Sequence, residues 1–405
     1  MPDRPQRVTP AILITLGLLA AAAPLSTDLY LSAFPTMAAD LATTATGVQL
    51  SLTTFLIGAG VGQVIFGPWS DRSGRMVPLL VGLLVYVVSS VIAAIAPSVT
   101  VLIIARALQG IGSSAGMVIG RAIVLDRQSG TEAARALNVM IAITGIAPII
   151  APLVGSALVD PLGWRGILWV VFGLALVSLI AAVAVLRESL SVEERRRRRS
   201  ERAPGAWRGL LALPFVGSTL TFAFGMGVLM AYISASPFVY QTLIGLSEIG
   251  YGLGFAVNAV GMSLTTIISN RLHRRYSLMR LTGTGLTLSM IGVLATLACA
   301  VAGIESWLLM IPLFIAIAPL GLVLGNASAI AMSAVSARTT GLASSFLGLG
   351  QFALAGIAAA LVGLGGESTA VPMALIMLIS GVIAIAGLVL IRFARTPQRE
   401  AVPAA

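Results

Sequence analysis

The sequence contains no lysine, since all 25 of its basic residues are arginine. A P-loop lysine, a kinase lysine and a Schiff-base lysine are therefore excluded. The chain has one histidine, His273, and one cysteine, Cys299. A single histidine excludes His-rich metal sites and the usual Ser/His/Asp triad, and a single cysteine forms no internal disulfide. We expect no metal and no cofactor, and we interpret Cys299 as a small apolar side chain.

Charge is scarce as well. Only 10% of the residues are charged and 58% are hydrophobic, with a mean hydropathy of +1.00. A soluble surface does not have this composition, so the sequence predicts a membrane protein surrounded by the lipid bilayer. The formal charge of +10 does not indicate a nucleic-acid partner, because the basic residues do not form a patch on a polar domain.

Twelve apolar runs approach the roughly 20 residues that span the hydrocarbon of a bilayer. The first run is too long for the apolar region of a cleaved signal, and eleven more follow, so we expect it to be retained. We predict an all-α membrane protein with twelve transmembrane helices, at residues 11–33, 48–69, 77–96, 99–125, 136–159, 165–186, 209–236, 247–270, 278–302, 306–332, 340–364 and 370–391.

Arginine placement predicts the orientation of these helices. If the N-terminus is cytoplasmic, 23 of the 25 arginines fall in cytoplasmic segments, only Arg165 falls outside and only Arg106 lies deep in a helix. Positive residues favour the cytoplasmic side, so both termini are predicted there. The preference for arginine over lysine, with abundant Ala, Gly and Val, suggests a GC-rich bacterial genome and hence a multi-pass protein of the bacterial inner membrane.

The longest cytoplasmic segment, residues 187–208, contains "EERRRRRSER". It predicts a linker between an N-terminal six-helix bundle at residues 1–186 and a C-terminal one at 209–405. A solvated tether that touches anionic headgroups and a specific binding role are both open for the linker. An internal echo supports the division, since "DRSGR" at 71–75 and "NRLHR" at 270–274 each follow a predicted helix.

The stretch "GPWSDRSGRM" after the second predicted helix brings both signs of charge to the cytoplasmic rim. Glycine permits close helix approach or a tight turn, and a charge latch that forms in only one packing of two bundles biases a two-state equilibrium. An ordinary loop with solvated ions is the alternative. We predict a gate in which Asp126, at the end of the fourth helix, is the partner; its residues are Gly67, Asp71, Arg72, Gly74, Arg75 and Asp126.

This stretch, Gly-x-x-x-Asp-Arg-x-Gly-Arg, closely resembles the loop signature of the major facilitator superfamily, although Met76 stands where the family often has a further basic residue. The resemblance implies twelve helices in two six-helix bundles and a transporter. We expect it to act as a monomer.

Two charges lie deep in apolar helices. Arg106 shares a face of the fourth helix with Gln109, Gly110 and Ser113, and its permanent charge needs a counter-ion. Asp28, at a comparable depth in the first helix, is the candidate, and their pairing is a hypothesis. A purely structural ion pair is the alternative. In the functional reading the carboxylate stays ionised beside arginine and takes up a proton when the pair separates.

The motif "LxxxRxxQGxG" around Arg106 also resembles the fourth-helix signature of proton-dependent facilitators, which implies that this residue takes part in proton coupling. The stretch "STDLYLSAFP" resembles the first helix of drug:proton antiporters, especially the bicyclomycin and chloramphenicol resistance branch. Some relatives carry a second acid where this chain has Ala20 or Ala21. One acid more naturally carries one proton.

The fifth predicted helix contains "TGIAPIIAPLVGS", in which Gly145, Pro148, Pro152 and Gly155 follow one helical face. Both prolines remove backbone hydrogen bonds and favour a bend. The spacing resembles the antiporter signature of the family, with Ala151 where glycine is usual. We predict a helix pivot that favours export, with a packing kink as the alternative.

Methionine and aromatic side chains suit several apolar ligands, because they pack adaptably. Stripes of this kind also form ordinary contacts between helices or with lipid. Asn258, Asn326 and Gln351 are expected to face the interior. The predicted substrate-binding residues are Asp28, Gln109, Ser113, Ile141, Thr144, Phe222, Met226 and Met230.

These patterns predict a proton-coupled multidrug efflux transporter that exports small amphiphilic drugs by alternating access, with amphenicols or bicyclomycin as first candidates. A proton-coupled nutrient or metabolite importer of the same fold is the alternative. An intramembrane enzyme is disfavoured, because it needs paired catalytic acids or a nucleophile with a base.

Overall fold

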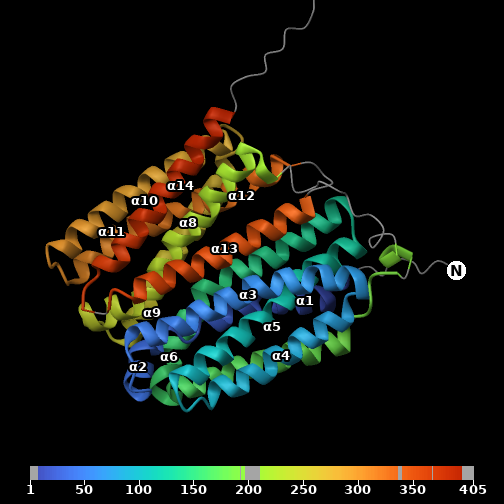
Figure 1. The fold of residues 1–405 in the computed structure, drawn as a ribbon, viewed down its shortest axis with the longest axis horizontal. Helices are drawn as coiled ribbons and strands as arrows, with labels where there is room; N and C mark the ends of the chain where they lie inside the picture. The colour runs from blue at the N-terminus through green and yellow to red at the C-terminus, as the bar shows by residue number, and fades with distance from the viewer. Residues whose placement is uncertain (1–7, 192, 197–209, 336–339, 367, 395–405) are drawn as a thin grey trace, which may run out of the picture.

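The computed structural model of the chain describes residues 8–191, 193–196, 210–335, 340–366 and 368–394. In these residues the chain forms helices joined by turns and short loops (Figure 1). Its longer helices are α1 (Pro10–Asp28), α3 (Ala45–Ser73), α4 (Met76–Ala94), α5 (Val99–Arg127), α6 (Gly130–Val185), α8 (Leu213–Phe238), α9 (Glu248–Leu272), α10 (Leu278–Val301), α13 (Thr340–Gly363) and α14 (Val371–Ala394). The shorter ones are η1 (Leu31–Ala33), α2 (Phe34–Asp40), η3 (Val239–Leu243), η4 (Trp307–Leu309), α11 (Met310–Ile317), η5 (Ala318–Leu322) and α12 (Leu324–Ser333).

Eleven helical segments in the described residues are long and apolar enough to cross a membrane. One of them, α6, has 56 residues, more than twice the length that a bilayer requires. Gly163 divides it, because its φ of 64° and ψ of 176° lie outside the helical region and suit a residue without a side chain. Two crossings in α6 bring the total to the predicted twelve, so the prediction of an all-α membrane protein is confirmed.

The helices alternate in direction, which gives the molecule two distinct ends. We call one the basic end: α1 starts there, α14 finishes there, and the chain turns there at Gly74 and between α9 and α10. We call the other the far end, where the chain turns near Ala42, Gly163, Gly245 and Gly303. Both ends of the described chain therefore lie at the basic end.

The small-residue run of α5 lets this helix sit between α3 and α4 with almost no side chain between backbones. A Cβ on Gly110 would collide with the carbonyl oxygen of Phe55 in α3, and one on Gly112 would lie 2.5 Å from the backbone nitrogen of Tyr86 in α4. Backbone contact of this kind is how small residues hold membrane helices together.

The helices up to Val185 pack mainly on one another, and so do those from Leu213 onward. The two sets meet where α3 packs on α13 and α6 packs on α9, as Figure 1 shows for α3 and α13. The exact domain boundaries remain a prediction. Much of the predicted linker, residues 192 and 197–208, lies outside the described residues.

The far end is sealed by contacts between the two sets of helices. The rings of Phe34 and Phe238 lie with their centroids 6.2 Å apart. Polar side chains bond to backbone carbonyls across the same boundary: Gln49 Nε2 to Ser234 O at 2.9 Å, Gln241 Nε2 to Ser32 O at 2.9 Å, and Thr46 Oγ1 to Gly363 O. The two sets are therefore joined at the far end and leave space between them toward the basic end.

Candidate functional site

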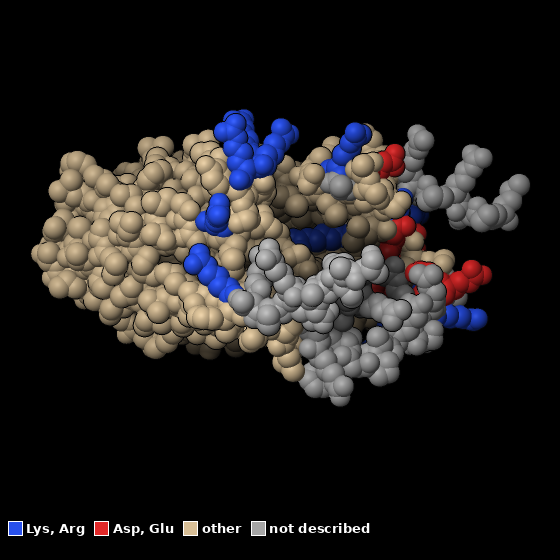
Figure 2. All heavy atoms as spheres, turned by 90° about the horizontal axis from the view of Figure 1, so that it is seen from above, with Lys and Arg blue, Asp and Glu red and all other residues tan. Residues whose placement is uncertain are grey.

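A cavity of about 760 Å³ lies between the two sets of helices. Its wall runs from Asp28 near the far end to Arg121 and Leu125 near the basic end. Figure 2 shows the molecule hollowed between its halves, with basic side chains around and inside the hollow. A volume of this size holds a drug-sized molecule.

Most of the wall is apolar and adaptable. Phe222, Met226 and Met230 of α8, three of the predicted substrate-binding residues, line the cavity. Met262 and Phe352 join them from α9 and α13. Methionine and aromatic groups pack against ligands of different shapes. Thr144 of α6 also lines the cavity, so the predicted substrate residues on these two helices are partly brought together.

Gln109 and Ser113, predicted to bind substrate, are not among the residues that line the cavity. Both are fully buried in α5. Gln109 donates to Ser90 Oγ at 2.7 Å, and Ser113 donates to the carbonyl oxygen of Gly110 at 3.1 Å. They point into the packing around α5, because the cavity is lined by another stripe of this helix.

Ile141 is a second correction. Its side chain is 62% exposed and is not in the cavity wall, whereas the neighbouring Met140 is buried. The inward face of α6 runs through Met140, Thr144 and Pro148, at steps of four. Ile141 lies about 100° around the helix from Met140 and so falls outside this face.

Two of the three polar residues expected in the interior line the cavity, and the third does not. Asn258 and Gln351 line the cavity. Asn258 donates to Tyr232 Oη at 3.1 Å and to Tyr240 Oη at 3.2 Å, which fixes its position. Asn326 is buried away from the cavity, where its Oδ1 lies 2.8 Å from His273 Nε2.

Asp28 is the acid of the cavity wall. It is the last residue of α1 and is 5% exposed. Thr27 Oγ1 donates a hydrogen bond to its Oδ1 at 2.8 Å. Among the described residues that line the cavity, no other carries a carboxyl group.

Arg106 is fully buried and does not form the predicted ion pair with Asp28 in this conformation. Its guanidinium lies over two aromatic faces, 4.3 Å from the ring centroid of Tyr30 and 4.4 Å from that of Phe55. It also donates to Gln109, while its Nε and Nη2 have no hydrogen-bond partner in the part of the chain that the structure describes. The chain leaves the α-helix after Asp28, so the ring of Tyr30 reaches the cation instead.

Arg121 belongs to the site although the sequence grouped it with the cytoplasmic segments. It lines the cavity on the stripe of α5 that includes Met117, Val118, Ala122 and Leu125. These residues recur at steps of three and four, so their common helical face can be recognised from the sequence. It did not indicate which face of α5 looks into the cavity.

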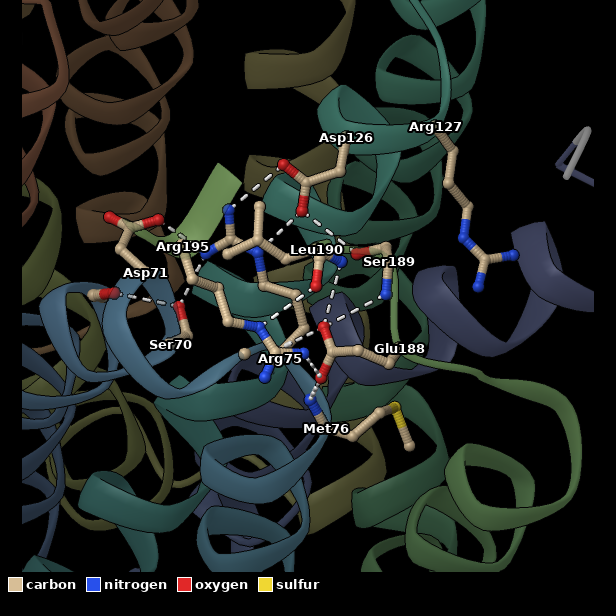
Figure 3. A network of polar contacts seen from close by, with 12 residues as sticks. Ser70, Asp71, Arg75, Met76, Asp126, Arg127, Glu188, Ser189, Leu190 and Arg195 are labelled. Atoms are coloured by element: carbon tan, nitrogen blue, oxygen red, sulfur yellow. Dashed lines mark hydrogen bonds and ion pairs between the residues drawn. The ribbon is translucent and has the colours of Figure 1, made fainter. Parts of the chain in front are cut away.

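Asp126, the predicted partner of the charges at the basic end, contacts Arg75. Arg75 is 2% exposed, and its guanidinium contacts Asp126 at 2.7 Å, Asp71 at 2.7 Å and Ser70 Oγ at 2.8 Å (Figure 3). Burial works to lower the pKa of Arg75, but the bonds and charges of Asp126 and then Asp71 outweigh it and raise the pKa above its ordinary value. All four residues belong to the N-terminal set of helices.

Glu188, just after α6, was not predicted as part of this network. It accepts hydrogen bonds from the backbone N–H groups of Arg75 at 2.9 Å and Met76 at 3.2 Å, and it pairs with Arg195 at 3.4 Å (Figure 3). Burial works to raise the pKa of Glu188, but these backbone bonds and Arg195 lower it below its ordinary value. The linker thus caps the N-terminus of α4, where a negative charge is favourable.

The remaining gate residues differ in how strongly the geometry depends on them. Gly74 has a φ of 96°, a backbone conformation that strains any residue with a side chain, and a Cβ there would lie 2.5 Å from Glu188 Oε2. At Gly67 a Cβ would meet only Val118 at an ordinary 3.7 Å, so close packing does not require this glycine. Arg72 is exposed.

The four predicted pivot residues lie in different surroundings. Gly155 lets α6 touch the backbone of Leu29 just beyond α1. Pro152 is buried against α9, and Pro148 lines the cavity. Gly145 is exposed and has open space where a Cβ would stand. Pro148, Pro152 and Gly155 therefore occupy the seam between α6 and its neighbours, and Gly145 does not.

Three relatives are similar over much of their length. An uncharacterized MFS-type transporter, YdgK, of Bacillus subtilis is 38% identical over 92% of this chain and 93% of its own. A chloramphenicol resistance protein of Pseudomonas aeruginosa is 37% identical over 62% of this chain and 59% of its own. A bicyclomycin resistance protein homolog of Haemophilus influenzae is 26% identical over 91% of this chain and 92% of its own.

The fold matches solved transporters. A bacterial homolog of the human lysosomal transporter Spinster, in an inward-facing and occupied conformation, superposes with a TM-score of 0.73 over 97% of this chain and 98% of that one, at 16% identity. The family model described as Major Facilitator Superfamily matches residues 16–360. The predicted resemblance is confirmed, and the chain belongs to the major facilitator superfamily of membrane transporters.

Proposed function

We propose that this transporter exports small amphiphilic drugs from the bacterial cytoplasm in exchange for protons. The relatives named for chloramphenicol and bicyclomycin resistance support drug export. The arginine-rich basic end supports a cytoplasmic opening, because positive residues favour that side. An adaptable apolar wall of methionine and aromatic side chains supports amphiphilic substrates.

The observation that carries the proposal is the position of Asp28. Its carboxyl group is buried at the wall of the substrate-sized cavity, without an ion pair, at the C-terminal end of α1. An ionised carboxylate is costly in such surroundings, and the dipole of a helix C-terminus opposes negative charge. The neutral form suits this conformation. Binding of a drug releases the proton through the open basic end, and the ionised form takes up the next proton in the conformation that opens at the far end.

Arg106 supplies a partner for the ionised form. Its Nε and Nη2 lack hydrogen-bond partners in the described residues. A rearrangement that withdraws the ring of Tyr30 brings these donors to the carboxylate and stabilises its charge. Opening of the far end accompanies this step and breaks the bonds of Gln49 and Gln241 across the seam. The gate residues around Arg75 and the pivot on α6 bias the equilibrium between the two conformations.

One proton provides enough free energy for this exchange. A proton that crosses roughly 100 mV gains about 2.3 kcal/mol. One pH unit adds about 1.4 kcal/mol. One-for-one exchange with a neutral drug therefore sustains a gradient on the order of a few hundredfold.

The test is drug susceptibility of a sensitive host that expresses the chain, with and without an uncoupler. We expect the inhibitory concentration of chloramphenicol to rise, and to return to the empty-vector value with the uncoupler or with Asp28→Asn. Glu305→Gln, which removes one charge from an exposed far-end turn, is the matched control and retains resistance. Full resistance in Asp28→Asn rejects the coupling role, and drug accumulation by expressing cells favours the importer.

A further inference from the structure

Arg121 lies inside the membrane-spanning part of α5, six residues before the end of the helix. It shares its stripe with Met117, Val118 and Leu125, all of which line the cavity, and its side chain is exposed to this space. A guanidinium is always charged at physiological pH and presents five donors in a planar fork. Its position therefore puts a permanent positive charge beside the path of the substrate.

No acid neutralises this charge in the part of the chain that the structure describes. None of the four ion pairs there involves Arg121, and no described side chain accepts a hydrogen bond from it. The acid next along the helix, Asp126, already binds Arg75. The acid that does line the cavity, Asp28, belongs to its opposite end.

The separation of Asp28 and Arg121 follows from the packing of α1 on α5. Gly116 of α5 faces Leu19 of α1, and Gly120 faces Leu16, so the two helices run antiparallel. Counted from this contact at a rise of 1.5 Å per residue, Asp28 and Arg121 lie about 20 Å apart along the helices. The cavity has an acid at its deep end and an arginine near its opening.

We propose that Arg121 is the anion-binding subsite of the cavity, and that it selects amphiphiles with a carboxylate or a comparable anionic group. This inference rests on the proposed function, because it names the substrate class of the same cavity. The anionic group pairs with Arg121, and the apolar body lies against Phe222 and Met226 of the opposite wall. Guanidinium and carboxylate form two parallel hydrogen bonds, which gives this class an advantage over organic cations.

Chloramphenicol and its succinate half-ester test this inference, since they share one body and differ by a carboxylate. Binding is measured at equilibrium to the purified full chain in phosphatidylcholine nanodiscs, which contain no anionic headgroup. We expect Arg121→Gln to raise the Kd of the half-ester about tenfold or more, because it removes a charged hydrogen bond. The Kd of chloramphenicol changes less than about twofold. Arg121→Lys keeps most of the affinity, because it keeps the charge.

Two controls separate this inference from the proposed function. Arg280→Gln removes the same charge from an exposed position at the basic end and leaves both affinities unchanged. As the second control, binding is measured without a proton gradient, so the subsite is tested separately from the coupling role proposed for Asp28. Equal loss of both ligands in Arg121→Gln, or equal half-ester binding by wild type and Arg121→Gln, overturns the subsite.

Salt dependence provides a measurement on the unmodified protein. Higher ionic strength screens an accessible charge pair, so half-ester affinity falls from low salt to 1 M salt while chloramphenicol affinity does not. A half-ester affinity that does not change with salt, or wild-type protein that prefers an organic cation to the half-ester, contradicts the assignment even if Arg121→Gln does not fold.

Discussion

The ring centroid of Tyr30 lies 4.3 Å from Arg106 Cζ, between the end of α1 and the buried face of α5. An aromatic face thus stabilises the cation for which the sequence suggested a carboxylate. The cation–π attraction of a desolvated pair is about 2 kcal/mol, and it brings no negative charge to the guanidinium. Arg106 is therefore held but not neutralised, as the proposed exchange of partners requires.

Substitution of Tyr30 tests this relationship. We expect Tyr30→Leu to lower the free energy of unfolding by about 2 kcal/mol, because it removes one of the two rings over Arg106. Tyr30→Phe keeps the ring and loses only a 3.1 Å hydrogen bond to Ser51, at about 1 kcal/mol. Thermal unfolding of the purified protein measures both. Equal destabilisation by the two variants would show that the ring face contributes nothing.

Replacement of either acid beside Arg75 is expected to lower the free energy of unfolding, but by very different amounts. Asp126 is 4% exposed, so Asp126→Asn leaves a buried guanidinium poorly compensated and costs about 3 kcal/mol or more. Asp71 is 46% exposed, and Asp71→Asn costs at most about 1 kcal/mol. Chemical unfolding of the two variants side by side provides the comparison. A larger effect of Asp71→Asn contradicts the network in Figure 3.

Acid should loosen the linker from the start of α4. The pKa of Glu188 is lowered in the folded protein from an ordinary 4.5, so its stabilising effect is complete above about 4.5 and is lost as the pH falls through the folded value. Hydrogen-exchange protection of the Arg75 and Met76 amides is expected to decline over that acidic range. Glu188→Ala removes both acceptor oxygens and lacks protection already at neutral pH, and Glu305→Ala behaves as wild type. Wild-type protection that persists below this range refutes the cap.

Charge movement distinguishes the substrates. If one proton enters for each drug that leaves, a neutral drug moves one charge per cycle and an anionic amphiphile moves two. Each charge gains about 2.3 kcal/mol per 100 mV, so the voltage-driven gradient of the anion is about 50-fold steeper at that voltage. Flux of chloramphenicol and its succinate half-ester in proteoliposomes, at potentials set by potassium and valinomycin, measures this ratio. Identical voltage dependence of the two ligands rules out the scheme.

The sequence by itself determined the twelve crossings, since an apolar run of bilayer length forms a helix to satisfy its own backbone. It also indicated the close contact of α5, because only small residues allow helix backbones to touch. The meeting of Arg75 with Asp126 was indicated as well, because both lie beside helix ends at the same rim. These features depend on composition, length and chain direction.

Only the tertiary structure decided which side of each helix faces the cavity. A polar residue of a membrane helix can face either the cavity or a neighbouring helix, and the sequence does not distinguish the two. Ile141, Gln109 and Arg121 therefore lie in surroundings other than those expected. The partners of Arg106 depend on how the chain leaves α1, and the role of Glu188 on a contact more than 100 residues away in sequence. Packing between distant segments sets these positions, and local sequence carries too little information to specify them.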